Sequence, residues 1–157
     1  MKNRLTKLDK FTDARGWSHM DIYNIIQEDT RVNGETTPPN WVKEGNFQIN
    51  YSVLYPGVIK AWHRHKNQDD YFCVIKGMAQ VGVYSDIKGA EKFFMGEHNP
   101  SLLHIKAGEW HGLTCVGNEP CGLLYLVTNK YDIQNPDEER EVHDAFVSED
   151  WWKPENK

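Results

Sequence analysis

The chain has 157 residues, of which 39% are hydrophobic and 12% aromatic, enough to bury one core and unlike a disordered chain. A formal net charge of −5, without a basic run, argues against nucleic acid or an anionic membrane as a partner. The sequence has no apolar stretch of membrane-spanning length, and its start lacks the apolar core of a signal peptide, so we expect a cytoplasmic protein. The three cysteines form no CxxC pair, and we expect them to be reduced thiols.

Residues 1–46 are expected to form an N-terminal arm with strands. Within this arm, the stretch NGETTPPNWVKEGN (33–46) contains Pro-Pro and several turn formers, so it indicates a loop.

After the arm, short strand-like runs recur at about ten-residue spacing, separated by turn formers. These runs are YSVLY (51–55), GVIKAWH (57–63), YFCVIKG (71–77), AQVGVYS (79–85), EKFFMG (91–96), SLLHIK (101–106), HGLTCVG (111–117) and CGLLYLVT (121–128). Many short, evenly spaced strands predict an all-β sandwich or barrel. We expect the barrel core to span residues 47–130 of a single domain, 1–157.

Residues 131–157 are expected to form a C-terminal extension. The stretch NPDEEREVHDAF (135–146) is consistent with a short helix, because Asn135 suits the cap, Pro136 suits the first helical position and acids follow. The last residues, WWKPENK, are expected to be a partly ordered tail. Its Trp151 and Trp152 are expected to pack on the domain or on a partner subunit.

The most informative stretch is GVIKAWHRHKNQDDYFCVIKG (57–77). His63 and His65 are two residues apart on a predicted strand, so they point to the same side. Asp70 begins the next strand, and His111 lies on a later one. Imidazoles with a carboxylate suit Fe, Mn, Ni or Zn, so these four residues are a candidate metal site. Asp70 suits a solvated turn equally well.

The spacing of these residues resembles the two motifs of the cupin superfamily. The first motif is a glycine, two histidines separated by one residue, an acid and a closing glycine. The second motif is a glycine followed by a histidine. This resemblance implies an antiparallel jelly-roll barrel with its site inside. Asp70 stands where the first motif usually has Glu, and Lys106 where the second usually has Pro. Many cupins of this shape hold no metal.

Four further stretches resemble, in order, the dTDP-4-dehydrorhamnose 3,5-epimerase family. They are FTDARGW (11–17), FQINYS (47–52), GVIKAWH (57–63) and KAGEWHGLTCVGNEPCGLLYLVTNKYDIQNPDEER (106–140). The resemblance implies an isomerase or epimerase of a nucleotide-linked 4-keto-6-deoxy sugar, in deoxysugar or polysaccharide biosynthesis. Such an enzyme removes a proton beside the carbonyl and returns one on the other face, and it requires no cofactor. Carried onto this chain, His63 is the base and Tyr131 the acid.

The same resemblance implies substrate-binding residues. Arg15, Gln48 and Asn50 match residues that hold the nucleotide and diphosphate, and His111 is also expected at the substrate. Lys60 stands where the family has an arginine, so it keeps the charge and loses the forked guanidinium.

Two catalytic features of that family lack a clear counterpart. The lysine that stabilises the enolate oxygen is replaced by Asp70, and the aspartate that orients the base has only Asp144 and Asp150 as candidates. Since Asp70 and His65 also complete a metal triad, a divalent metal held by His63, His65, Asp70 and His111 is the alternative means of polarising the carbonyl.

Two rival functions stay open. A metal-dependent cupin such as a non-haem iron dioxygenase would use the same histidines and carboxylate for O₂ chemistry. A non-catalytic sugar-binding cupin would use aromatic side chains such as Trp62 and Trp110 for stacking, although barrel packing suits them as well. The family resemblance also implies a homodimer with strands exchanged around the N-terminal region.

Overall fold

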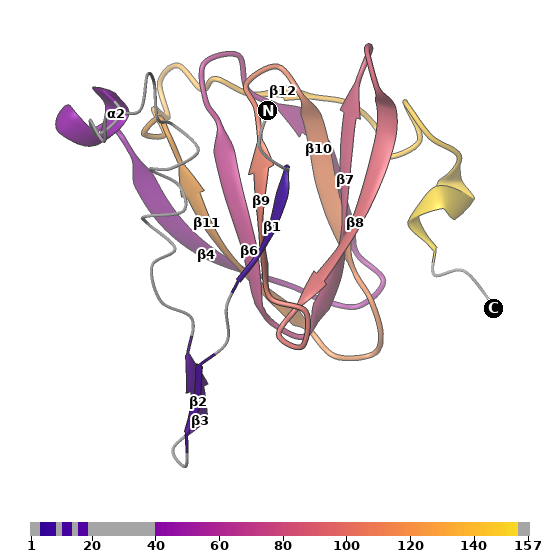
Figure 1. Ribbon diagram of the computed structural model, residues 1–157. Helices are drawn as coiled ribbons and strands as arrows, with labels where there is room; N and C mark the ends of the chain where they lie inside the picture. The colour runs from indigo at the N-terminus through magenta and orange to yellow at the C-terminus, as the bar shows by residue number, and fades with distance from the viewer. Residues whose placement is uncertain (1–3, 9–10, 14–15, 19–39, 154–157) are drawn as a thin grey trace.

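The computed structural model describes residues 4–8, 11–13, 16–18 and 40–153. These residues form two five-stranded antiparallel sheets packed face to face, with a separate two-stranded hairpin (Figure 1). The first sheet has the order β1-β9-β6-β11-β4, the second has the order β12-β5-β10-β7-β8, and β2 pairs with β3. The expected all-β cupin jelly roll is confirmed.

The predicted strand runs between residues 51 and 128 all become strands, numbered β4 to β11. The strands are β1 (Leu5–Lys7), β2 (Phe11–Asp13), β3 (Gly16–Ser18), β4 (Gln48–Leu54), β5 (Ile59–Arg64), β6 (Asp70–Lys76), β7 (Met78–Ser85), β8 (Gly89–Gly96), β9 (Ser101–Ile105), β10 (Trp110–Cys115), β11 (Cys121–Val127) and β12 (Glu139–Arg140). The helices are α2 (Asn40–Lys43) and a short 3₁₀ helix, η1 (Glu149–Trp152).

The space between the sheets is apolar at one end and polar at the other. Successive residues of a strand face opposite sides, so every second residue of β4 faces the space between the sheets. These inward residues are polar at the start of the strand and apolar at its end: Gln48, Asn50, Ser52 and Leu54. The apolar end is filled by the main core cluster. Its buried members are Phe72, Val74, Ala79, Val81, Val83, Met95, Leu103, Ile105, Leu113, Cys115, Cys121 and Leu123.

An irregularity between β5 and β10 decides what the polar end contains. His63 pairs with His111 but Lys60 pairs with Leu113, so β5 carries one extra residue over this interval, as in a β-bulge. Strict alternation would send Lys60 and His63 to opposite sides. The bulge turns both of them inward and turns Trp62 outward.

Gly112 permits this bulge. A Cβ atom at Gly112 would overlap the side chain of Ala61 and lie 2.7 Å from the carbonyl oxygen of Lys60. The two strands therefore approach more closely than any residue with a side chain would allow. The peptide bond between Ala61 and Trp62 is cis.

The predicted helix over residues 135–146 is wrong. The segment instead forms β12, in which Glu139 pairs with Arg64 and Arg140 with His63. Asp137 ties it to the turn after β5, since its carboxylate accepts the backbone N–H groups of Lys66 and Asn67 at 2.9 and 2.8 Å. Pairing with β5 therefore outweighs the local preference for a helical turn, and the C-terminal helical segment lies later, at η1.

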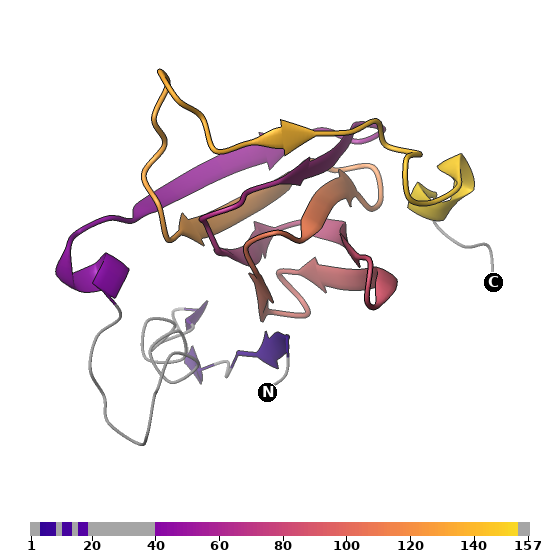
Figure 2. The same cartoon turned by 90° about the horizontal axis from the view of Figure 1, so that it is seen from above.

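The C-terminal residues cover the outer face of the second sheet, where Figure 2 shows η1 on the opposite side of the molecule from α2. Trp152 is buried, with its ring centroid 4.9 Å from that of Trp62, and its Nε1 donates to the carbonyl oxygen of His143. Gly82 leaves room for these rings, because a Cβ there would lie within 3 Å of three tryptophans. Trp151 and Trp152 thus pack on the domain itself.

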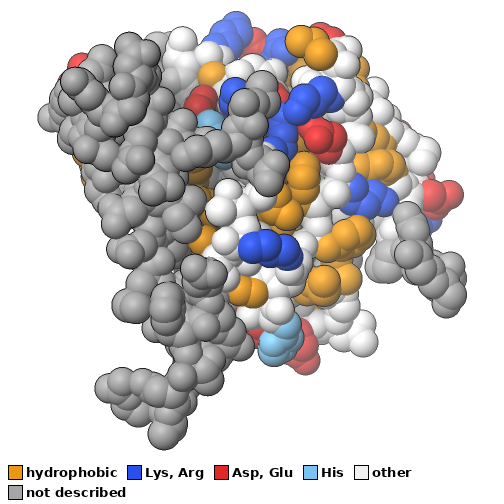
Figure 3. Space-filling model, viewed as in Figure 1, with side chains coloured by type: hydrophobic (Ala, Val, Ile, Leu, Met, Phe, Trp, Pro, Cys, Tyr) orange, Lys and Arg blue, Asp and Glu red, His pale blue; other side chains and the backbone are white. Residues whose placement is uncertain are grey.

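The described part of the N-terminal arm contributes β1, which pairs with β9, and α2, within the stretch predicted as a loop. All three cysteines are free and buried. On the face shown in Figure 3, basic, acidic and hydrophobic side chains are interspersed. Among the described residues, no helix has the length and apolar character needed to cross a membrane.

We expect Trp152→Ala to lower the free energy of unfolding by about 3–5 kcal/mol, because it removes a buried indole and leaves a cavity beside Trp62. Urea denaturation followed by circular dichroism measures this change. Ile87→Ala is the matched control, since that side chain is 95% exposed and its truncation should cost less than about 0.5 kcal/mol. Equal stability of the two variants would contradict the packing role of the C-terminal segment.

Candidate active site

The polar end of the sandwich holds a pocket of about 280 Å³ that opens to solvent. Both sheets line it: β4, β6 and β11 on one side, β5 and β12 on the other. This volume lies at the lower end of the range for small-molecule sites, so it suits a single sugar ring better than a complete nucleotide sugar.

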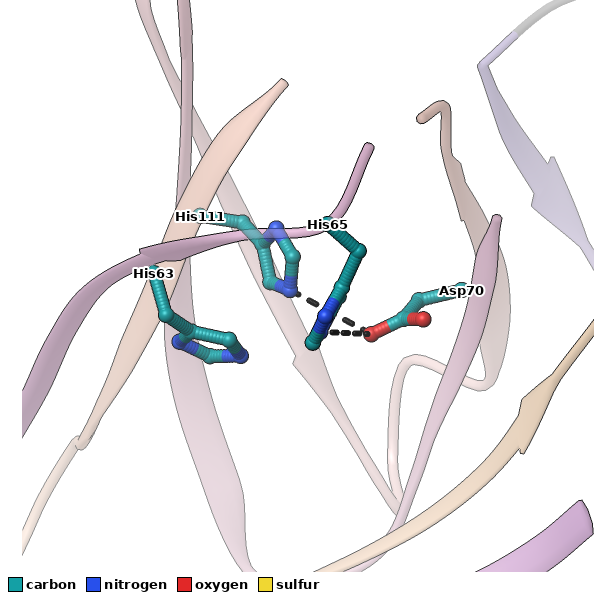
Figure 4. Close-up of side chains that lie close together, drawn as sticks. All are labelled: His63, His65, Asp70 and His111. Atoms are coloured by element: carbon teal, nitrogen blue, oxygen red, sulfur yellow. Dashed lines mark ion pairs between the residues drawn. The ribbon is translucent and has the colours of Figure 1, made fainter. Parts of the chain in front are cut away.

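Three histidines and one carboxylate lie close together, as Figure 4 shows. His63, His65 and Asp70 line the pocket, whereas His111, which was also expected at the substrate, is buried and does not line it. One ligand atom from each of His63, His65, Asp70 and His111 can be chosen so that all four atoms lie within 4.8 Å of one another. The His63 and His111 ring centroids are 4.1 Å apart, and the other two histidine pairs are 5.5 and 5.7 Å apart. The sequence-predicted cluster is therefore assembled from β5, the turn that follows it, β6 and β10.

Backbone carbonyl groups orient two of these histidines. His65 Nδ1 contacts the carbonyl oxygen of Asp137, and His111 Nδ1 lies 3.0 Å from that of Glu109. A carbonyl oxygen accepts only, so each Nδ1 carries the proton and each Nε2 presents a lone pair to the cluster. This arrangement is the one that metal-binding histidines use in proteins.

The contact between His111 and Asp70 requires a positive charge or a proton. His111 Nε2 is buried and has no hydrogen-bond partner in the described part of the chain. It lies 3.2 Å from Asp70 Oδ2, and both side chains are at most 3% exposed. A lone pair facing a buried carboxylate is repulsive, and burying such groups unpaired is costly. Protonation of the pair relieves this repulsion, and so does a divalent cation, so His65, Asp70 and His111 fit a metal ion.

The His63 imidazole differs from those of His65 and His111 because this side chain makes no hydrogen bond within the described residues. Burial lowers the pKa of His63, and the nearby His111, His65, Lys60 and Arg140 lower it further. The imidazole is therefore uncharged at neutral pH, which is the form that can accept a proton. Asp150 does not orient it, since its carboxylate pairs with Lys153 at 2.7 Å, and Asp144 does not line the pocket either.

The structure brings most other predicted substrate-binding residues to the same pocket. Gln48, Asn50, Lys60 and Tyr131 all line it. Gln48 Oε1 accepts the backbone N–H of Tyr131 at 3.2 Å, and Gln48 Nε2 donates to Asn50 Oδ1 at 2.7 Å. Tyr131 is 62% exposed and belongs to the loop after β11, a strand of the first sheet, whereas His63 lies on β5 of the second sheet. Arg15 lies outside the described residues.

Sequence reasoning missed several pocket residues, among them Tyr125, Asp137, Glu138 and Arg140. Tyr125 is inward on β11, where burial, Asp70 and Glu138 raise its pKa. The alternation of the CGLLYLVT run was the available signal for Tyr125. For the other three, the resemblance over residues 106–140 was the available signal, but it assigned them no role in the site.

An antiparallel jelly roll with a histidine–carboxylate cluster inside it defines a small cupin with a sugar-sized pocket. Residues 38–139 match the family described as the polysaccharide biosynthesis C-terminal domain. The chain belongs to this family.

The named relatives point to sugar metabolism. The chain is 43% identical, over 112 residues, to the probable low-salt glycan biosynthesis epimerase Agl13 of Haloferax volcanii, covering 67% of this chain and 72% of Agl13. It is 35% identical, over 143 residues, to the spore coat polysaccharide biosynthesis protein SpsL of Bacillus subtilis, covering 87% and 85%. These relatives support the predicted class of enzyme, a sugar epimerase or isomerase.

The fold is also that of a solved sugar epimerase. The crystal structure of NovW, a 4-keto-6-deoxy sugar epimerase from the novobiocin cluster of Streptomyces spheroides, superposes with a TM-score of 0.74. The alignment covers 96% of this chain and 74% of NovW at 18% identity, so it establishes the shared fold alone.

We expect added Zn²⁺ to bind the purified protein at one site, since the lone pairs of His65 and His111 already face Asp70. Asp70→Asn and His65→Ala should each weaken binding at least about tenfold, as loss of a ligand does. Isothermal titration measures the affinity, and His98→Ala is the control because that histidine is exposed and outside the cluster. No uptake, or uptake unchanged in Asp70→Asn, would show that a proton alone balances the cluster.

Proposed function

We propose that this protein is an epimerase acting on a nucleotide-linked 4-keto-6-deoxy sugar in glycan or polysaccharide biosynthesis. The observation that carries the proposal is that the half-buried His63 lines a sugar-sized pocket together with Tyr131, and that desolvation and neighbouring positive charges lower the pKa of His63. A carbonyl acidifies the C–H bonds beside it, so one base and one acid on opposite faces are sufficient to invert a carbon.

In this mechanism His63 removes a proton from the carbon next to the carbonyl. The enolate that forms is then protonated from the other face by the Tyr131 hydroxyl, and the carbon is inverted. Gln48 holds the backbone at Tyr131 and thereby the position of the phenol. The reaction transfers protons only, so it needs no redox cofactor.

The enolate oxygen needs a positive or proton-donating group, because Asp70 occupies the position of the family's lysine. Lys60 lines the pocket and has no ion-pair partner in the described part of the chain, so it supplies positive charge near His63. A divalent ion held by His65, Asp70 and His111 would supply Lewis acidity at the same place. Either arrangement leaves His63 free as the base.

The substrate class rests on the relatives and on the pocket together. NovW is described as a 4-keto-6-deoxy sugar epimerase. A reductase of Pseudomonas aeruginosa that is 29% identical over 92 residues is named for a UDP-linked 2-acetamido hexul-4-ose, and this chain covers 24% of it. Both names contain a 4-keto sugar. None of the relatives named above is described as a dioxygenase or as a purely sugar-binding protein.

Solvent deuterium exchange tests this proposal. With a UDP- or dTDP-linked 4-keto-6-deoxy sugar in D₂O, we expect NMR to show exchange at C3 or C5. His63→Ala should slow exchange by about a hundredfold or more, as loss of a general base does. Tyr131→Phe should keep exchange and slow inversion, because the enolate forms but is not protonated from the far face.

The controls separate the base from the metal. His98→Ala should behave as the wild type, and exchange should persist after chelation. Exchange that His63→Ala leaves intact would rule out His63 as the base. Exchange abolished by chelation would assign the histidines to a required metal ion and favour the metal-dependent reading.

We also propose a homodimer, formed through the outer face of β4. β4 is an edge strand, and its outward residues Ile49, Tyr51 and Val53 are 61%, 54% and 48% exposed. An apolar row of this kind on a sheet edge requires cover, and a second copy brings an identical row through a two-fold axis.

Sedimentation analysis tests the dimer. We expect the wild type to sediment as a dimer and Tyr51→Lys to shift it to a monomer, because the charge would be buried at the interface. Ile87→Lys, at an exposed position outside β4, should leave the dimer intact. A monomeric wild-type protein would contradict the proposal.

A further inference from the structure

Two of the three cations that line the pocket come from neighbouring strands, and the third is Lys130. Lys60 comes from β5, and Arg140 comes from β12, which pairs with β5 so that Arg140 lies opposite His63. Both side chains are exposed, both line the pocket, and both act electrostatically on His63. Lys60 and Arg140 thus lie near the candidate base, in a pocket that Asp132, Asp137 and Glu138 also line.

Neither cation is tied firmly to the protein. Lys60 has no ion-pair partner within the described residues. Arg140 pairs through Nη2 with Glu138 Oε1 at 2.7 Å, but the Arg140 side chain is 69% exposed, and exposed ion pairs contribute little to stability. The guanidinium can therefore exchange this carboxylate for another anion at small cost.

The size of the pocket indicates which anion this is. A cavity of about 280 Å³ accepts the sugar ring, so the group attached to the ring must lie at the rim. In a nucleotide sugar that group is a diphosphate. A guanidinium binds phosphate oxygens in a bidentate fork, which an ammonium cannot do, and Lys60 provides only the ammonium.

We propose that Arg140 is a binding residue for the diphosphate of the substrate, and that it supplies the fork that Lys60 lacks. Glu138 holds the guanidinium in the free protein and is displaced by the diphosphate. The inference rests on the proposed function for the identity of the substrate. It assigns a role to β12, which reaches the pocket only through its pairing with β5.

Binding of UDP and of inorganic pyrophosphate, measured by isothermal titration, tests this assignment without requiring turnover. We expect Arg140→Ala to weaken binding of both probes at least about tenfold, and Arg140→Lys to recover part of the loss. Glu138→Gln should strengthen binding, because it removes the competing carboxylate. Uridine, which has no phosphate, should show no dependence on Arg140.

Lys76→Ala is the matched control, because it removes one positive charge from an exposed residue of β6 that does not line the pocket. It should bind both probes as the wild type does. Circular dichroism on each variant verifies that the fold is retained.

Three results would overturn the assignment. The first is that the wild-type protein binds neither probe at millimolar concentration, and the second is that Arg140→Ala binds both probes as tightly as the wild type. The third is that Glu138→Gln weakens binding as Arg140→Ala does. The last result would mean that the Glu138–Arg140 pair supports the structure of β12.

The test separates this inference from the proposed epimerase. If Arg140 governs UDP binding but no keto sugar exchanges deuterium, the diphosphate site stands and the epimerase proposal fails. If exchange depends on His63 while Arg140→Ala leaves the KM for the nucleotide sugar unchanged, the epimerase proposal stands and the assignment of Arg140 fails.

Discussion

The close approach of Gly112 to Ala61 is the contact on which the site depends. It allows β5 to carry an extra residue against β10, and the strand changes face between Lys60 and His63. Because of this change, a cation and the candidate base share one pocket while Trp62 points away from it. A side chain at position 112 would force the strands apart and separate these groups.

The outward turn of Trp62 links the pocket to the C-terminal segment. Trp62 packs against Trp152 on the outer face of its sheet, and its backbone exchanges two hydrogen bonds with Glu141. These bonds continue the pairing that places Arg140 beside His63. The packing of Trp62 against Trp152 on the outer face therefore also helps to hold the short strand β12, which shapes the mouth of the pocket.

Inside the pocket the electrostatics are divided between neighbouring groups. Asp70 is buried and faces the lone pair of His111, so the inner cluster attracts a proton or a cation. His63 lies beside Lys60 and Arg140 and stays uncharged. The side of the site with Asp70 and His111 is thus suited to a positive centre, and the side with His63 is suited to accepting a proton. These are the two demands that chemistry next to a carbonyl makes, and the wall opposite β5 supplies the tyrosine.

The sequence by itself determined the strands, because alternation and turn formers mark β4 to β11. It also determined the histidine–carboxylate cluster, because His63 and His65 are two residues apart and Asp70 and His111 fit the cupin spacing. It could not predict β12, because the local signals around Asn135 favour a helical turn and only the free edge of β5 outweighs them. Alternation alone places Lys60 and His63 on opposite faces, and only the family resemblance assigned both of them to one site. Only the tertiary structure decided these points, since each depends on a contact between segments far apart in the chain.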